Sequence, residues 1–163
     1  MASTSRPKIR RPSATTPRKD ESLLLNAFLG GKIEGRNFHH ADHVRVGFEL
    51  LCRHTFPDAL AAYSAALKGI ATRAGNPGAY HETITVAFLS LIAEHRAAGR
   101  YADCEAFLKN NPQLLDKSIL ERWYAPERLL SEIARQTFVM PEGDRSWPQS
   151  GGQARARGAG GRQ

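Results

Sequence analysis

Histidines gather at two points of the chain, in patterns suited to metal or proton-transfer chemistry. His39, His40 and His43 lie within five residues, and His81 belongs to a Tyr-His-Glu-Thr segment further along. Each group marks the change from a polar loop to a helical pattern. Because His40 and His43 are three residues apart, they share one face of a helix. His39 falls outside that spacing, and we expect it to cap the helix.

The second histidine group is expected to complete a pocket begun by the first. His81 continues the apolar stripe of the helix that it precedes, so its ring is predicted to point inward. Three imidazoles, from His40, His43 and His81, are the usual ligands of a catalytic zinc ion that keeps one position for water. Two histidines with the carboxylate of Glu82 would instead suit non-haem iron. The predicted cofactor is therefore a divalent metal, zinc or iron.

Carboxylates next to these histidines could move protons. A bound metal lowers the pKa of its water, and a carboxylate that is not a ligand could accept the released proton. Asp42 and Glu82 are the candidates for this catalytic role.

A structural interpretation of the same histidines is also open. His39 or His40 could cap a helix, His43 could face a surface groove, and His81 could be a buried ring with satisfied hydrogen bonds. The chain contains neither an H-E-x-x-H motif nor a Cys-x-x-Cys pair, so no motif decides between the two interpretations.

The elements that would position these residues are all helical. Apolar residues recur at helical spacing, and glycine or proline turns separate the repeats. The predicted helices cover approximately residues 23–28, 41–54, 57–74, 80–97, 101–108 and 126–134, with one or two further short helical pieces between residues 114 and 124. The fold class is therefore predicted to be all-α, an irregular bundle of five to seven helices over residues 21–140.

Three local features refine this prediction. The helix at about residues 80–97 is apolar around most of its circumference, so it should be the centre of the bundle. Gly47 interrupts the second helix, which would make sense where another helix or a ligand comes close. The last helix should start at Pro126. Its predicted buried side consists of Leu129, Leu130, Ile133 and Ala134.

The basic residues are concentrated in the two ends of the chain. The formal net charge is +7, yet residues 1–19 alone hold six basic and no acidic residues, and residues 141–163 hold four basic and two acidic ones. Residues 20–140 are consequently close to neutral. We predict a disordered basic arm over residues 1–20 and a disordered Gly/Ala/Arg tail over residues 141–163. A near-neutral core argues against specific nucleic-acid binding.

The remaining composition predicts a soluble cytoplasmic protein. The longest strongly apolar run, residues 84–93, is well short of the roughly 20 residues that a membrane helix needs. The N-terminal region lacks the apolar stretch of a secretory signal. Cys52 and Cys104 fall at apolar helical positions and are expected to be thiols rather than a disulfide.

The pattern Phe38-x-His40-x-x-His43, followed by Tyr80-His81-Glu82-Thr83, resembles a group of small, uncharacterised bacterial helical proteins. The resemblance spans about residues 22–140 and excludes the terminal segments. It implies a helical domain with a histidine-centred site and carries no activity or substrate with it.

Three functions are compatible with these patterns. The protein could be a metal-dependent or acid/base enzyme acting on a small metabolite. It could instead be a non-catalytic sensor or carrier that binds a small ligand or metal in the same pocket. A third hypothesis is a protein-interaction adaptor whose basic arms contact nucleic acid. The sequence does not indicate an oligomeric state.

Overall fold

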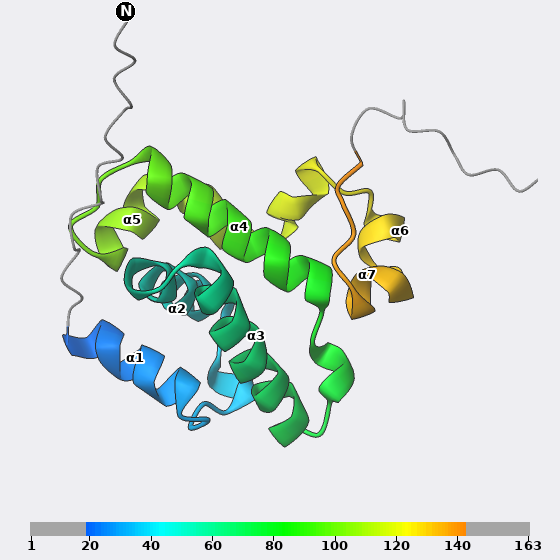
Figure 1. Cartoon of the computed structure of the whole chain (residues 1–163), viewed down its shortest axis with the longest axis horizontal. Helices are drawn as coiled ribbons and strands as arrows, with labels where there is room; N and C mark the ends of the chain where they lie inside the picture. The colour runs from blue at the N-terminus through cyan, green and yellow to red at the C-terminus, as the bar shows by residue number, and fades with distance from the viewer. Residues whose placement is uncertain (1–18, 143–163) are drawn as a thin grey trace, which may run out of the picture.

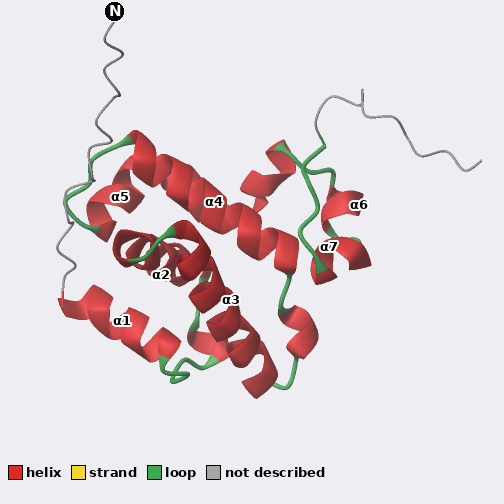
Figure 2. Ribbon diagram, viewed as in Figure 1, coloured by secondary structure: helices red, strands yellow, loops and turns green. Residues whose placement is uncertain are grey.

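Helices make up all of the regular structure between residues 19 and 142, the part of the chain that this computed structural model describes (Figures 1 and 2). The elements are α1 (Lys19–Leu29), η1 (Gly35–Asn37), α2 (His40–Arg53), α3 (Phe56–Arg73), η2 (Pro77–Ala79), α4 (Glu82–Ala98), α5 (Cys104–Asn110), η3 (Pro112–Leu115), η4 (Lys117–Arg122), α6 (Pro126–Leu129) and α7 (Glu132–Gln136), where η denotes a 3₁₀ helix. The prediction of an irregular all-α bundle is confirmed. The predictions for the two terminal arms concern mainly residues 1–18 and 143–163, which lie outside the described residues.

Turn residues end the helices where the sequence predicts. Gly31 follows α1 with a φ of 69°, and Gly75 follows α3 with a φ of 72°. This left-handed backbone favours glycine, since glycine has no Cβ to clash there. Pro57 lies in the first turn of α3, where its missing N–H costs no helical hydrogen bond.

Helices α2 and α4 cross at close range in the centre of the bundle. Helix α2 packs against α1, α3, α4 and α5, while α4 packs against α2, α3 and α7. A Cβ added to Gly47 on α2 would lie 2.9 Å from Cδ1 of Ile92 on α4 and 3.3 Å from Cδ1 of Leu89. The predicted close approach at Gly47 is therefore confirmed.

Aromatic rings join α1 to the segment that carries the histidines. Phe28 of α1 stacks on Phe38, with ring centroids 5.3 Å apart, and lies 5.6 Å from the ring of Tyr63 on α3. All three rings are buried. This packing fixes the start of α2 against α3.

The C-terminal part of the bundle differs from the prediction. The expected single helix is split into α6 and α7, because the chain turns at Leu130 and restarts with Ser131 as N-cap, whose hydroxyl accepts the N–H of Ala134. Leu129 and Ala134 are buried as predicted, but Leu130 and Ile133 are 68% and 63% exposed. The prediction that Leu130 and Ile133 are buried was wrong, because it treated α6 and α7 as one continuous helix.

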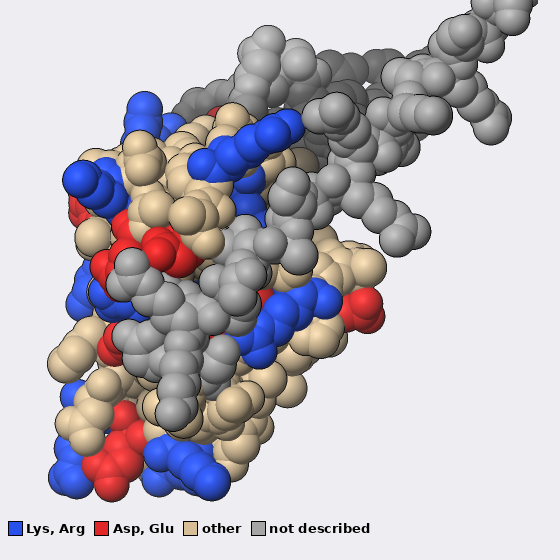
Figure 3. Space-filling model, turned by 90° about the vertical axis from the view of Figure 1, so that its left-hand side faces the viewer, with Lys and Arg blue, Asp and Glu red and all other residues tan. Residues whose placement is uncertain are grey.

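The surface of the described bundle mixes both signs of charge. In Figure 3, basic and acidic side chains are interspersed over the face shown, with no broad region of a single sign. No helix between residues 19 and 142 has the length and apolarity needed to cross a membrane.

Candidate functional site

A pocket of about 660 Å³ lies among α2, α3 and α4, bordered by η1 and the η2 turn. His40, His43 and His81 all line it. Exposed residues such as Asn76 and Lys117 also belong to its wall, so the pocket reaches the surface. Most of the lining is apolar and consists of Gly35, Phe38, Val44, Leu67, Ile70, Ala71, Ala74, Ala79, Ile84, Phe88 and Ile92.

Two smaller hollows adjoin this pocket. One, of about 430 Å³, shares Phe38, His40, His43 and Lys117 with it. The other, of about 480 Å³, shares Gly35, Ile70 and Ala74 at the opposite side. His40, His43 and Lys117 therefore line the boundary between the main pocket and the first hollow.

His40 begins α2 and is held by a backbone carbonyl from a distant segment. Its Nε2 lies 2.9 Å from the carbonyl oxygen of Leu114, and its ring meets the ring of Phe88 edge to face at 5.0 Å. Because a carbonyl can only accept a hydrogen bond, we assign the imidazole proton to Nε2. The other nitrogen, Nδ1, is then an acceptor.

The pKa of His40 is lowered from its ordinary value, chiefly because burial disfavours the charged imidazolium. The ammonium group of Lys117 acts in the same direction. The hydrogen bond to Leu114 and the carboxylate of Asp116 act in the opposite direction. His40 is therefore neutral at pH 7.

His43 is the more strongly perturbed of the two rings. It packs against Phe38 at 4.3 Å between centroids, and burial lowers its pKa to about 4. The Tyr63 hydroxyl donates to the backbone oxygen of His43 at 3.2 Å and lies 3.4 Å from Nδ1. Since Tyr63 has only one hydroxyl proton, we assign the imidazole proton to Nδ1, which leaves Nε2 as an acceptor.

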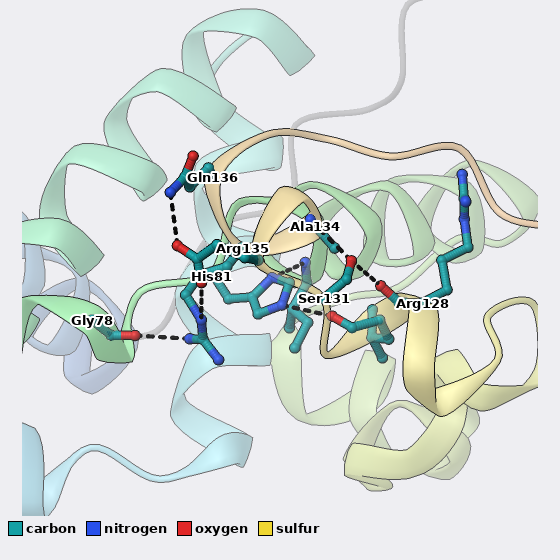
Figure 4. A network of polar contacts seen from close by, with 10 residues as sticks. Gly78, His81, Arg128, Ser131, Ala134, Arg135 and Gln136 are labelled. Atoms are coloured by element: carbon teal, nitrogen blue, oxygen red, sulfur yellow. Dashed lines mark hydrogen bonds and ion pairs between the residues drawn. The ribbon is translucent and has the colours of Figure 1, made fainter. Parts of the chain in front are cut away.

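His81 lines the pocket, but its two ring nitrogens are used by the protein. It is the N-cap of α4: Nδ1 accepts the N–H of Ile84 at 3.3 Å, and Nε2 donates to the carbonyl oxygen of Leu129 at 2.8 Å. Burial is the main reason that its pKa is lowered. Figure 4 shows the ring within a polar network in which Arg135 also donates to the carbonyl of Gly78 at 2.8 Å.

The two predicted catalytic carboxylates do not line the pocket. Asp42 accepts the backbone N–H of His39 at 2.9 Å, so it helps to cap α2, and it lies 3.6 Å from the guanidinium of Arg45. Glu82 accepts the hydroxyl of Tyr80 at 3.0 Å and pairs with Lys68 at 3.4 Å. Asp42 therefore supports the start of α2, and Glu82 joins the start of α4 to Lys68 on α3.

The predicted metal ligands are not arranged as a metal site. The described side chains, those of residues 23–142, include no group of three His, Cys, Asp or Glu residues that could hold a metal ion. His40 and His43 are neighbours, with ring centroids 6.5 Å apart, but both nitrogens of His81 already have hydrogen-bond partners. Zinc or iron binding remains a prediction to be tested in solution.

Two residues of the site were not predicted. Tyr63 lies at an apolar helical position of the sequence, which is typical of a core residue, although a buried tyrosine hydroxyl needs a hydrogen-bond partner and so signals a polar neighbour. Lys117 is an exposed residue of a short 3₁₀ segment, and no pattern in the sequence distinguishes it. Its place beside the histidines follows from a tertiary contact only.

Comparisons of the chain with protein-family models, with curated proteins and with solved structures give no match.

Proposed function

We propose that this protein binds a small, largely apolar organic molecule in the pocket among α2, α3 and α4. The observation that carries the proposal is a pocket of about 660 Å³ whose lining is mostly apolar and also includes polar side chains, among them His40, His43 and Lys117. Small-molecule sites typically have this size and this combination, since the apolar wall supplies binding energy and the polar groups fix orientation.

The polar groups favour binding over acid/base catalysis. A general base works best when its pKa lies near the operating pH. His43, with a pKa lowered to about 4, is a weak base at neutral pH but a good hydrogen-bond acceptor. Asp42 and Glu82, the other candidates for proton transfer, are outside the lining. These observations support a carrier or sensor module.

A pocket-filling variant tests the proposal. Ala71 on α3 is buried and lines the pocket, so Ala71→Leu should occupy part of its volume. Ala65 on the same helix is exposed and outside the lining, which makes Ala65→Leu the matched control. Both variants would be checked for folding by circular dichroism.

The measurement is ligand-observed NMR with a library of aromatic and aliphatic fragments. We expect fragments that bind the wild-type chain to lose affinity for Ala71→Leu at least tenfold, and to keep it for Ala65→Leu, because a filled cavity excludes them. The proposal fails if no fragment binds the wild-type chain, or if Ala71→Leu binds as well as the control.

A further inference from the structure

Two imidazole rings and one ammonium group lie together where the main pocket meets the adjoining hollow. His40 and His43 line both the main pocket and the adjoining hollow, and so does Lys117. The ammonium of Lys117 is close enough to both rings to oppose their protonation. A ligand group at this boundary therefore meets two imidazoles and one cation.

The two imidazoles offer acceptors there, not donors. A neutral imidazole has one N–H, which His40 donates to the carbonyl of Leu114 and which His43 turns toward Tyr63. No backbone group of residues 19–142 and no side chain of residues 23–142 forms a hydrogen bond with Nδ1 of His40 or Nε2 of His43. A ligand that satisfies these nitrogens must bring a proton with it.

The cation beside them lacks a counter-charge in the described part of the chain. Among the side chains that the structure describes, those of residues 23–142, no carboxylate lies within ion-pair distance of the Lys117 ammonium group. Oδ1 of the adjacent Asp116 accepts the backbone N–H of Ser118 at 2.9 Å and the hydroxyl of Ser118 at 2.8 Å. A ligand oxygen of negative character would therefore be stabilised by Lys117.

We infer that the pocket takes a carboxylic acid with an apolar body, bound with one proton between its carboxyl group and His43, and with its other oxygen toward Lys117. This inference rests on the proposed binding function and specifies the ligand class. An alcohol could donate to an imidazole but would leave the cation without a partner. A fully ionised acid alone would place its lone pairs against the acceptor nitrogens.

The proton balance follows from the acid's state in solution. A simple carboxylic acid has a pKa of roughly 4 to 5 and is ionised at pH 6.5. Binding then takes up one proton from the solvent, which is shared between a carboxyl oxygen and Nε2 of His43. No other bond is formed or broken. The apolar body lies along Leu67, Ile70 and Phe88.

The charged groups around His43 determine the expected pH dependence. Burial disfavours its protonation most, and His40 and Lys117 act in the same direction, while Asp42 on the same helix acts against them. The facing wall of α4 contributes the uncharged Phe88 and Ile84. An anion placed near Lys117 would raise the pKa of His43 and so make the proton uptake favourable.

The test is isothermal titration calorimetry of the full chain with 4-phenylbutanoate and its neutral counterpart 4-phenyl-1-butanol. We expect the acid to bind with uptake of about one proton, measured in two buffers of different ionisation enthalpy. Its Kd should increase about tenfold from pH 5.5 to 6.5, because one proton is bound with each ligand. The alcohol should bind without proton uptake and without pH dependence.

A lysine variant locates the carboxyl group. Lys117→Gln should weaken binding of the acid on the order of fivefold and leave the alcohol unchanged, since the lost ion pair is partly solvated. Lys109→Gln, an exposed lysine of α5 outside the pocket, is the matched control. An equal effect of Lys117→Gln on acid and alcohol would overturn the placement of the carboxyl group.

The two proposals fail in different ways. If the alcohol binds as well as the acid, or if the acid binds without proton uptake, the carboxylic acid inference is wrong and the binding function stands. If neither probe binds while other fragments distinguish Ala71→Leu from Ala65→Leu, the ligand class is again wrong. If the fragments also make no distinction, the binding function fails as well.

Discussion

His43 and His81 show how two buried histidines of one pocket can be used differently. Each ring is neutral because burial disfavours its charge. Both ring nitrogens of His81 have partners within the protein: Nδ1 accepts the N–H of Ile84, and Nε2 donates to the carbonyl of Leu129. His43, which lines the pocket, has Tyr63 beside Nδ1 and no hydrogen-bond partner at Nε2 among the described residues. At this scale the hydrogen-bond partners, and not the histidine spacing, separate a structural ring from one that is open to the proposed ligand.

The burial of His43 predicts acid sensitivity of the fold. The pKa is about 4 in the folded chain and about 6.5 in the unfolded chain, so the unfolded state binds more protons between these values. The contribution of His43 to stability is complete above pH 6.5 and is lost as the pH falls toward 4. We expect a loss on the order of 2 kcal/mol in the free energy of unfolding across this window, measured by urea denaturation.

Two variants separate His43 from the other titrating groups. His43→Gln should have a shallower dependence of stability on pH than the wild-type chain. His54→Gln should keep the wild-type dependence, because His54 is an exposed C-cap residue of α2. Equal slopes for wild type and His43→Gln would contradict a buried, neutral His43.

Metal titration tests the zinc and iron hypothesis at the same residues. A metal at 100 times its Kd would stabilise the folded chain by about 2.7 kcal/mol. Because the described residues lack a group of three ligands, we expect zinc and iron(II) to leave the thermal midpoint unchanged. A rise in the midpoint that disappears in both His40→Ala and His43→Ala would restore the metal hypothesis.

At the scale of helices, most helix ends could be predicted from glycine and proline residues in the sequence. Gly31, Gly75 and Pro57 fix helix ends through backbone conformation, which depends on few neighbours and can be predicted from sequence. The split between α6 and α7 was missed, since Leu130 continues a helical stripe although it is exposed. The turn there depends on packing of Leu129 and Ala134 against the rest of the bundle.

The crossing of α2 and α4 predicts an unfavourable Gly47→Ala substitution. Alanine improves helix propensity by about 1 kcal/mol, but its Cβ would come within 2.9 Å of Cδ1 of the buried Ile92. Overpacking of a filled core typically costs about 1–3 kcal/mol. We expect a net loss on the order of 1 kcal/mol in urea denaturation.

A double-mutant cycle assigns this loss to the contact. Ile92→Val removes the Cδ1 methyl, so the variant that carries both changes should be more stable than the sum of the single losses predicts. Gly69→Ala on α3 serves as a comparison. The atom nearest its added Cβ is the end of the flexible Arg73 side chain at 3.0 Å, which can move aside. Additive losses for Gly47→Ala and Ile92→Val would contradict the proposed clash.

At the scale of the whole molecule, the C-terminal segment is joined to the bundle through the first turn of α4. His81 donates to Leu129, and the Thr83 hydroxyl donates to the carbonyl of Thr137 at 2.8 Å and accepts the N–H of Val139 at 3.0 Å. Figure 1 shows this end of α4 beside α7 and the extended segment that follows it. These partners are about 50 residues apart in sequence.

The separation of contacting residues along the sequence explains which part of the candidate site could be predicted. His40 and His43 share a face because of local helical spacing, which the sequence contains. The bonds from His81 to Leu129 and from His40 to Leu114 join residues 48 and 74 positions apart. No periodicity encodes such pairs, so the sequence left the structural interpretation of His81 open without naming its partner, and gave no sign that Lys117 belongs to the site.

The anchoring role of Thr83 predicts a cost for an isosteric change. Thr83→Val keeps the shape but leaves the buried N–H of Val139 without an acceptor, which costs roughly 1–3 kcal/mol. We expect the free energy of unfolding to fall by about 2 kcal/mol. Native-state hydrogen exchange should show the largest loss of protection at Val139.

Ser90 on the same helix provides the control for Thr83. Its hydroxyl donates to the carbonyl of Val86 in the preceding turn, so Ser90→Ala removes a local contact only. We expect its effect on stability to be small and its effect on exchange at Val139 to be absent. Similar exchange in Thr83→Val and Ser90→Ala would show that the Thr83 hydroxyl does not anchor the segment.

The attachment of the C-terminal segment also sets a limit for shortened versions of the chain. A truncation after α4 would remove Leu129 and Arg135, which bond to His81 and to the Gly78 turn beside the pocket. It would also expose the α4 residues that α7 covers. Glu142 still contributes, since its N–H bonds to the carbonyl of Trp123. A minimal version that keeps the pocket intact must therefore extend through residue 142.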